Sequence, residues 1–247
     1  MENPSYIALS LMTGLHRQME VVANNMANSS TPGFQGEKLT FRSMISPKAM
    51  NPGVQGAERS AAFVTEAALL RDTRAGVMER TGNTLDVGIV GDGYFAVQTD
   101  DGVRYTRHGS FRPDAQGQLI LSNGARVLGD NGAPITLPAG DTNIEIDRRG
   151  NITGKDGTIG KLRVVKFENE QAMRKVGENM FETDADALPV DGRTELAQGM
   201  IEGSNVQPVL EVTQMIDLMR RFQSATRVLE QEHERVRRAI DKISRVA

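Results

Sequence analysis

The chain has 247 residues, enough to bury a sizeable core and to form roughly one to three domains. Its 29 basic and 32 acidic residues are mixed along the chain and give a net charge of −3. This balance argues against a nucleic-acid-binding protein, which needs a concentrated basic face. The sequence contains no Cys, which excludes disulfides and thiolate metal sites.

The sequence contains no apolar run long enough to span a bilayer. The N-terminus also lacks the basic segment and apolar core of a secretory signal peptide. By itself this pattern predicts a cytoplasmic protein. It leaves open export by a route that reads no cleaved signal.

The first predicted element is an N-terminal helix within residues 1–33. Its apolar residues recur at helical spacing: Ile7, Leu11, Leu15, Met19, Val22 and Met26. We expect the helix to end before Pro32-Gly33, because proline disfavours helical backbone in the preceding residue and glycine permits a turn. Residues 63–77 show no convincing period, and 48–56 is polar with interspersed Pro and Gly. We therefore predict an extended or irregular connector over 34–81.

Residues 82–200 are predicted to form an antiparallel β-domain. Short apolar runs alternate with turn pairs such as Asn123-Gly124, Asn131-Gly132 and Asp156-Gly157. These pairs favour hairpins because both of their residues tolerate positive φ. Helix-length periodic segments do not alternate with these runs, which argues against a parallel βαβ sheet.

A second helix is predicted within residues 201–247. A strict three-and-four spacing joins ten positions, eight of them apolar: Val212, Met215, Met219, Phe222, Thr226, Leu229, His233, Val236, Ile240 and Ile243. This spacing is typical of a coiled-coil seam. A second apolar strip contains Leu9, Met12, Val21, Ile216, Leu218 and Val228. The predicted fold class is therefore α+β, mainly β, with terminal helices that pair as a coiled coil and then pack against copies of themselves.

Motifs for cofactors and metals fail on their physical context. Residues 91–96 fit a loose dinucleotide fingerprint, but they continue as a strand where the fingerprint requires a helix. The histidines, His16, His108 and His233, lack metal-ligand spacing, and His233 is interpreted as a seam residue that fixes register. A loop over 183–192 lacks the full set of calcium ligands. We predict neither a cofactor nor a metal, and no catalytic residue.

Three separated segments resemble motifs of bacterial flagellar rod and hook proteins. The first is Ala23-Asn24-Asn25-Met26-Ala27-Asn28 with Ser29-Ser30-Thr31-Pro32-Gly33-Phe34. The second joins Asp86-Val87-Gly88-Ile89 and Gly91-Asp92-Gly93-Tyr94-Phe95 to Tyr105-Thr106-Arg107 and Gly109-Ser110-Phe111. The third is Glu202-Gly203-Ser204-Asn205-Val206, followed by Pro208, Glu211, Met215-Ile216 and Arg220. The resemblance covers nearly the whole chain.

The resemblance implies a structural subunit of the flagellar basal-body rod, the tubular drive shaft that transmits torque across the periplasm. It implies partners among copies of the chain, other rod subunits and the flagellar type III export apparatus, with export that needs no cleaved signal. It also implies that residues 1–33 and 201–247 form an inner tube. Arg220-Arg221-Phe222 resembles the proximal rod subunit more than the distal one. The distal type stays open as an alternative.

From these arguments we predict an assembly interface on the terminal helices. Its residues are Leu11, Leu15, Met19, Val22, Asn24, Asn25, Met26, Asn28, Asn205, Val212, Met215, Met219, Arg220, Phe222, Leu229, Val236 and Ile240. Asn24 and Asn28 either bond to a neighbouring helix or cap their own. Asn205 is expected to cap the second helix. Arg220, Arg221, Arg227 and Glu230 are candidates for ion pairs between subunits that set register.

Two other functions stay open at this stage. The β-domain could bind carbohydrate while the helices form a dimerisation stalk, which would require a cluster of exposed aromatic side chains. An enzyme is the third hypothesis, although the sequence contains no nucleophile elbow or other triad signature.

Overall fold

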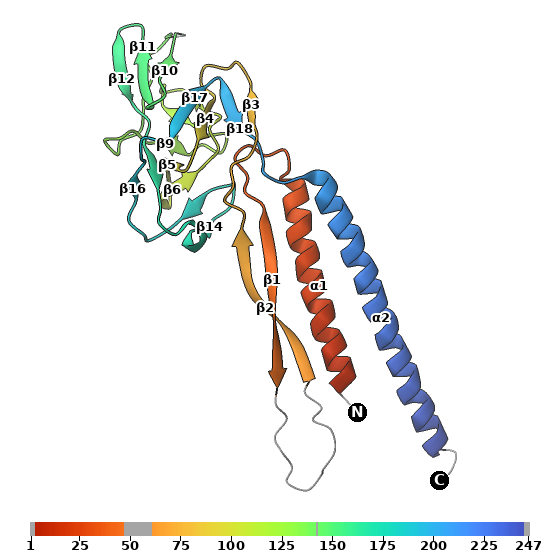
Figure 1. The fold of residues 1–247 in the computed structure, drawn as a ribbon. Coiled ribbons are helices and arrows are strands. Elements are labelled where there is room, and N and C mark those ends of the chain that lie inside the picture. Colours follow the sequence, from red (N-terminus) through yellow and green to blue (C-terminus); the bar gives the residue numbers. More distant parts are fainter. Residues whose placement is uncertain (1–2, 47–60, 142, 245–247) are drawn as a thin grey trace. The chain divides into compact units, whose positions relative to one another are not determined.

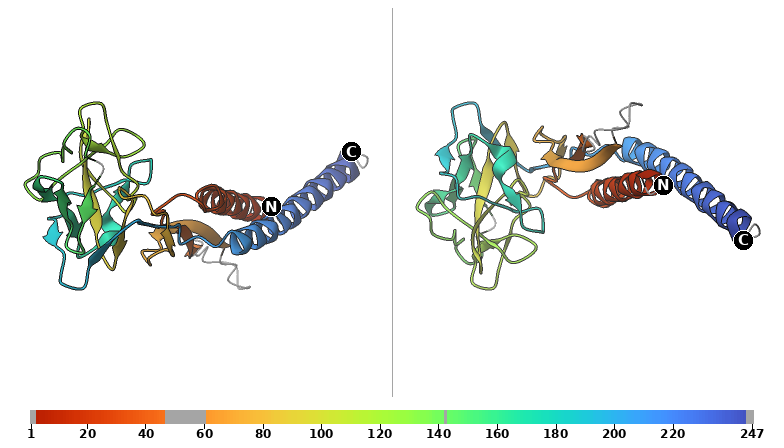
Figure 2. Two further views of the ribbon diagram at one scale, coloured as in Figure 1. Left: turned by 90° about the horizontal axis from the view of Figure 1, so that it is seen from above. Right: turned by 90° about the horizontal axis from the view of Figure 1, so that it is seen from below.

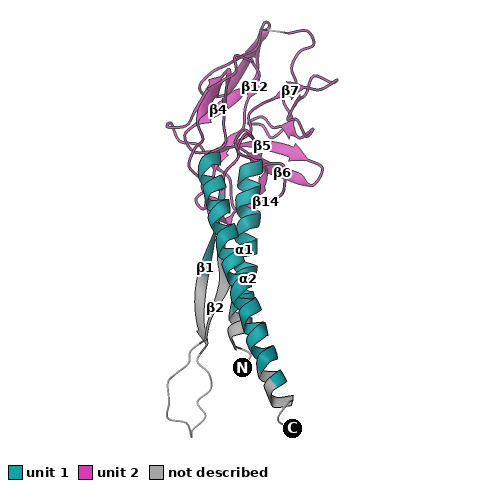
Figure 3. Cartoon of the chain, turned by 90° about the vertical axis from the view of Figure 1, so that its right-hand side faces the viewer, with its two compact units in different colours: residues 1–27, 37–70, 207–247 teal, residues 28–36, 71–206 magenta. Residues whose placement is uncertain are grey.

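The structure is a computed structural model that describes residues 3–46, 61–141 and 143–244. It divides into two compact units (Figure 3). We call residues 1–27, 37–70 and 207–247 the helical unit, and residues 28–36 and 71–206 the β unit. The predicted α+β class is confirmed, with one helix near each end of the chain and antiparallel strands between them.

Two helices dominate the helical unit. Helix α1 spans Asn3–Ala27 and α2 spans Pro208–Ser244. They pack side by side and run in opposite directions, so both chain ends lie at the same end of the unit (Figure 1). With 37 residues against 25, α2 continues beyond the first residues of α1 (Figures 1 and 2). Neither helix, over the described residues, combines the length and apolarity needed to cross a bilayer.

The helical unit also contains most of a two-stranded sheet. Strand β1 spans Glu37–Ser46 and β2 spans Ala61–Arg71. The hydroxyl of Thr40 donates to the carbonyl of Ala68, 28 residues further on, at 2.9 Å. The segment 34–81 was expected to be an extended or irregular connector, and this regular pairing was not foreseen, because it depends on a partner distant in sequence. The predicted loop over 48–56 lies outside the described residues.

The β unit consists of short strands. They are β3 Met78–Arg80, β4 Val87–Val90, β5 Tyr94–Thr99, β6 Gly102–Thr106, β7 Arg112–Pro113, β8 Leu119–Ile120, β9 Arg126–Val127, β10 Glu145–Ile146, β11 Asn151–Gly154, β12 Gly157–Lys161, β13 Val164–Lys166, β14 Arg174–Lys175, β15 Phe181–Glu182, β16 Leu188–Pro189, β17 Glu195–Gln198 and β18 Met200–Glu202. A short 3-10 helix spans Glu170–Ala172. The largest sheet has the order β14-β15-β6-β5-β9-β8-β7, and β13 joins β5 to β16. Smaller sheets are β10-β11-β12, β4-β17 and β3-β18.

The predicted hairpins are confirmed where the turn pairs stand. Strands β8 and β9 flank Asn123-Gly124, and Gly124 has a φ of 86°. Strands β11 and β12 join at Asp156, with Gly154 opposite Gly157. Gly157 has a φ of 123°, and positive φ at Gly124 and Gly157 is the conformation that such turns require.

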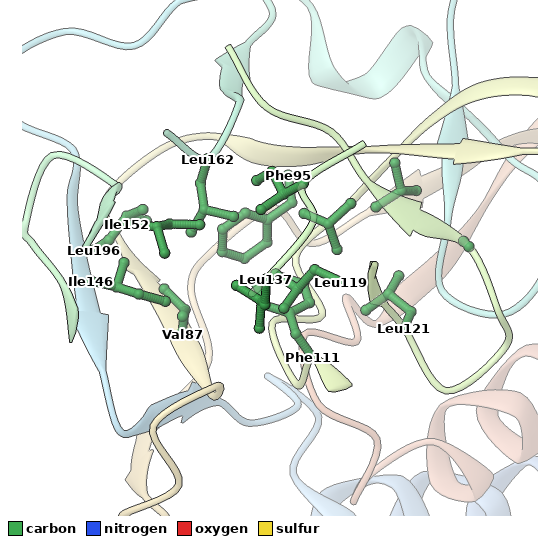
Figure 4. Packing of buried hydrophobic residues seen from close by; sticks show 14 of the residues in the cluster. Val87, Phe95, Phe111, Leu119, Leu121, Leu137, Ile146, Ile152, Leu162 and Leu196 are labelled. Carbon is green, nitrogen blue, oxygen red and sulfur yellow. The ribbon is translucent and has the colours of Figure 1, made fainter. Parts of the chain in front are cut away.

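The core of the β unit has two faces because β5 is covered on both sides. Four successive residues of β5, Tyr94 to Val97, have no exposed surface. Phe95 and Val97 belong to the larger cluster, drawn in Figure 4, whereas Tyr94 belongs to a second cluster with Phe167 and Phe181. This division follows from the alternation of side chains along a strand. Phe95 meets Phe111 edge to face, with ring centroids 5.1 Å apart.

Candidate assembly site

The contact between α1 and α2 centres on a small apolar cluster. Leu15 and Val22 of α1 and Leu218 of α2 are buried, with Met19, Met215 and Phe222 packed around them. Leu11 and Met26, which belong to the same predicted stripe, are 41% and 37% exposed. The described part of the α1 stripe is therefore buried in its middle and partly exposed at Leu11 and Met26.

The α2 residues that face α1 differ in phase from the predicted seam. Met215, Phe222 and Leu229 are half-buried as the spacing requires. Leu218 and Ala225 are buried, however, whereas Val212 and Met219 are each 44% exposed. Coiled-coil pairing of α1 and α2 through the predicted seam is therefore not confirmed, and contacts of Val212 and Met219 with other copies stay a prediction. Apolar residues run along two adjacent strips of α2, and spacing alone cannot decide which strip faces α1.

The C-terminal part of α2 contains the last residues of the predicted interface. Those whose side chains the structure describes are exposed. Val236 is 39% exposed and His233 is exposed. The side chain of Ile240 lies outside the described residues, so its assignment to the interface stays a prediction.

Asn25 connects α1 to β1 within the helical unit. Its Nδ2 donates to the carbonyl of Glu37 at 2.8 Å, and its Oδ1 accepts from the N–H of Glu37 at 2.9 Å. The side chain is 3% exposed. Because an unpaired buried backbone group is costly, this double bond fixes where β1 begins beside α1. Contact of Asn25 with another subunit would require this arrangement to open.

The neighbouring asparagines lie differently. Asn24 is exposed on α1. Asn28 follows the last residue of α1, and its Oδ1 accepts a hydrogen bond from the hydroxyl of Thr31 at 3.2 Å. The carbonyl of Asn28 also accepts from the Thr31 N–H at 3.1 Å. Asn28 thus holds the turn after the helix, and a bond from either residue to another helix stays a prediction.

Asn205 does not cap α2, which corrects the expectation. The helix begins at Pro208, a residue favoured at the first helical position. Asn205 lies before it, in the β unit, and its Oδ1 accepts from the N–H of Gly36 at 2.8 Å. Its Nδ2 donates to the carbonyls of Asp72 and Arg74, both at 2.8 Å. One amide therefore ties together three segments that are distant in sequence.

A buried ion pair connects two of the resembling motifs. The Nε of Arg107 donates to Glu202 at 2.7 Å, and the two side chains are 3% and 2% exposed. Arg107 also donates to the carbonyls of Gly93 and Gly91, at 2.9 and 3.0 Å. Glu202 accepts from the N–H of Gly76 at 2.8 Å. Such bonds compensate for the desolvation of both charges.

Sequence reasoning missed this ion pair, although both residues stood in the quoted motifs. The Gly91 to Gly93 segment turns the chain from β4 into β5. Its carbonyls accept hydrogen bonds from Arg107, and Gly91 and Gly93 have φ values of 108° and 139°. The co-occurrence of the motifs was the available sign that their residues meet.

Side chains that could do chemistry are held in structural roles. His108, Ser110 and Asp86 lie near one another, but the Ser110 hydroxyl donates directly to Asp86 at 2.9 Å. In a catalytic triad the histidine stands between them. Burial lowers the pKa of His108, opposed by the charge of Asp86. Among the described residues, groups of three potential metal ligands do not occur.

Most aromatic side chains of the β unit are buried, and Tyr105 is half-buried. Tyr94, Phe95 and Phe181 have no exposed surface, and Phe111 and Phe167 are 3% and 6% exposed. Burial raises the pKa of the Tyr94 hydroxyl, which donates to Glu170 at 2.9 Å. A carbohydrate pocket of the kind that a binding module would need requires exposed rings.

Family comparisons cover the three regions that carry the motifs. Residues 6–35 match the family described as flagella basal body rod protein, and residues 88–154 match the flagellar hook protein FlgE/F/G D1 domain. Residues 197–242 match the flagellar basal body rod FlgEFG protein C-terminal family. These are families of flagellar rod and hook proteins, and none is catalytic.

Full-length relatives agree. The chain is 32% identical to the flagellar basal-body rod protein FlgF of Caulobacter vibrioides, over the whole of both chains. It is 32% identical to FlgF of Salmonella typhimurium over 99% of each chain. It is also 32% identical to FlgG of Bacillus subtilis, over 91% of this chain and 92% of that protein. The chain belongs to the flagellar basal-body rod protein family and is a structural subunit of the flagellar rod.

Proposed function

We propose that the chain is a rod subunit of the proximal, FlgF type, which assembles with copies of itself and with other rod subunits through its terminal helices. The observation that best supports assembly through these helices is the distribution of exposed apolar side chains. Among the described residues, large exposed apolar side chains number three on α1 and seven on α2, against five elsewhere. A concentration of exposed apolar side chains on two helices is typical of a protein–protein contact.

The helices leave this surface open because one pairing covers only one strip of each. The paired face buries Leu15, Val22 and Leu218. The remaining apolar residues are Leu9, Leu11, Met26, Val209, Leu210, Val212, Ile216, Met219, Val228 and Val236. Additional helices from neighbouring copies would bury them in a tube with coiled-coil packing.

The FlgF type is favoured over FlgG by two features. FlgF of Caulobacter vibrioides and FlgF of Salmonella typhimurium align with 100% and 99% of the chain, whereas FlgG of Bacillus subtilis aligns with 91% of it. The distal type usually has Gln-Arg followed by Tyr, and in this chain Met219-Arg220 and Phe222 stand in those places. In this role the chain would need neither a catalytic residue nor a cofactor, would contact neither nucleic acid nor the bilayer interior, and would reach the rod through the flagellar export apparatus without a cleaved signal.

Deletion of the gene tests this proposal. In the bacterium that carries it, cells without the chain should lack hooks and filaments but retain the export base. Basal bodies isolated from such cells should also lack the distal rod protein, because the proximal segment has to form before it. If these basal bodies still contain a different protein of the FlgF type and lack only the distal rod protein, then this chain is itself the distal subunit. Normal rods would contradict both assignments.

A further inference from the structure

Helix α2 carries two exposed apolar surfaces in addition to its buried strip. The ridge consists of Val212, Ile216 and Met219, which are 44%, 40% and 44% exposed. The groove is a surface hollow between the helices, and it is lined by Leu11, Leu15, Arg220, Arg221, Ser224, Ala225 and Val228. At about 100° per residue, and with Leu218 facing α1, the ridge and the α2 residues of the groove project from opposite flanks of α2.

The two surfaces are complementary in shape and polarity. The ridge has branched or long side chains without charge. The floor of the groove on α2 contains Ser224 and Ala225, whose short side chains leave a hollow beside Val228 and Leu11. Insertion of a large apolar side chain between short ones is the usual way in which helices pack together.

Charge separates the same two regions of α2. Residues 208–219 contain two acidic residues, Glu211 and Asp217, and no basic one, a net charge of −2. Residues 220–231 contain three Arg and one Glu, a net charge of +2. Arg220 and Arg221, at the edge of the groove, form no ion pair within the described part of the chain. The two segments of α2 thus carry opposite net charges, which favours a parallel neighbour displaced along the axis over one in register, where like charges would lie side by side.

We propose that the ridge of one copy packs into the groove of a second copy, with their α2 helices parallel and offset along the axis. This inference rests on the proposed function and names the surfaces that carry it. Since the ridge and the groove lie on opposite flanks, each contact leaves one free ridge and one free groove. Such a heterologous contact repeats into a ring or an open helix, whereas two identical surfaces would end at a dimer.

Cysteine cross-linking tests the contact cleanly because the chain contains no Cys. Chains with Met219→Cys and chains with Val228→Cys are co-expressed in cells without the native gene, and basal bodies are oxidised after isolation. A disulfide needs Cα atoms within about 7 Å, so a 219–228 dimer should form about tenfold more than one to a control cysteine at Val103→Cys. Val103 is 39% exposed and lies on β6.

The outcomes separate this inference from the proposed function. Rods that assemble but yield only 219–219 or 228–228 dimers, or no dimer above the Val103 control, would overturn the ridge-in-groove contact and leave the rod role standing. Failure of the unmodified chain to enter basal bodies would overturn both.

A filled groove gives a second readout. Ser224→Phe should abolish the 219–228 cross-link and swimming, because a ring occupies the hollow that the ridge needs. Ser224→Ala keeps the hollow open and should retain at least half of both. The circular dichroism of the two variants checks that α2 is still helical, and an unchanged cross-link in a folded Ser224→Phe chain would contradict the proposal.

Discussion

The two units treat their apolar residues in opposite ways. In the β unit, β5 is buried on both faces, and aromatic rings from several strands meet in two clusters. In the helical unit, three residues form the buried centre and ten large apolar side chains are exposed along the helices. The first arrangement is typical of a unit that is complete within one chain. The second is typical of a unit that other chains complete.

Polar contacts show the same contrast. In the β unit, Arg107, Glu202 and Asn205 each bond to backbone groups from distant segments, and they do so where the three motifs converge. In the helical unit, the ion pairs on α2, such as Arg235–Glu232 and Arg238–Glu234, join residues one turn apart. Such short-range pairs support a helix but do not fix its partners.

The largest expected effect removes the buried ion pair of the β unit. Arg107→Ala leaves the Glu202 carboxylate buried without its charge partner and frees the carbonyls of Gly91 and Gly93. We expect a loss of about 3–5 kcal/mol in the free energy of unfolding. Urea unfolding followed by tyrosine fluorescence measures it, because two of the three tyrosines lie in the β unit.

A matched control is Arg148→Ala. Arg148 pairs with Glu195 at 3.7 Å, but the two side chains are 81% and 51% exposed. Its removal should cost less than about 1 kcal/mol. Equal losses for the two arginines would show that burial does not set the strength of the pair at Glu202.

Features that depend on neighbouring residues could be predicted from the sequence, whereas contacts between distant residues could not. Hairpins were predictable because Asn123-Gly124 and its equivalents determine a turn within a few residues. Helices were predictable because their period is written in the adjacent sequence. The Arg107–Glu202 pair joins residues 95 apart, and the role of Asn205 depends on segments more than 130 residues away. Local patterns contain no information about such contacts.

The strip of α2 that packs against α1 could not be predicted for a different reason. Both Met219 and Leu218 belong to apolar strips of α2, and only Leu218 faces α1. A chain that pairs with itself and with copies needs more than one apolar strip. The seam that the spacing predicted therefore includes residues, such as Val212, that this chain leaves exposed.

A second variant should destabilise the helical unit and leave the β unit unaffected. Leu218→Ala removes part of a cluster with only three buried members and should destabilise the α1–α2 contact by about 2–4 kcal/mol. Hydrogen exchange should increase along α1 and α2, while exchange in β5 and β6 stays the same. Faster exchange in the β strands as well would indicate that the two units unfold together.

Leu229→Asp should leave the stability of the β unit almost unchanged and should abolish assembly into rods. Leu229 is half-buried on α2, and the unfolding of the β unit should shift by less than about 0.5 kcal/mol. A charge in a helix contact with another copy is costly to desolvate, so the chain should not enter basal bodies. Leu229→Met conserves volume and serves as the control. Normal swimming with Leu229→Asp would remove Leu229 from the predicted interface.

The smallest expected effect is a pH dependence confined to the β unit. Burial lowers the pKa of His108 below its unfolded value, which is about 6.5. As the pH falls from 7 to 5, the unfolded chain binds a proton that the folded chain resists, so stability decreases over this window. His108→Gln cannot titrate and should make the urea midpoint less dependent on pH there, even if the substitution shifts its absolute value. An unchanged pH dependence of the urea midpoint in the His108→Gln chain would show that the buried imidazole of His108 is not the proton-linked group.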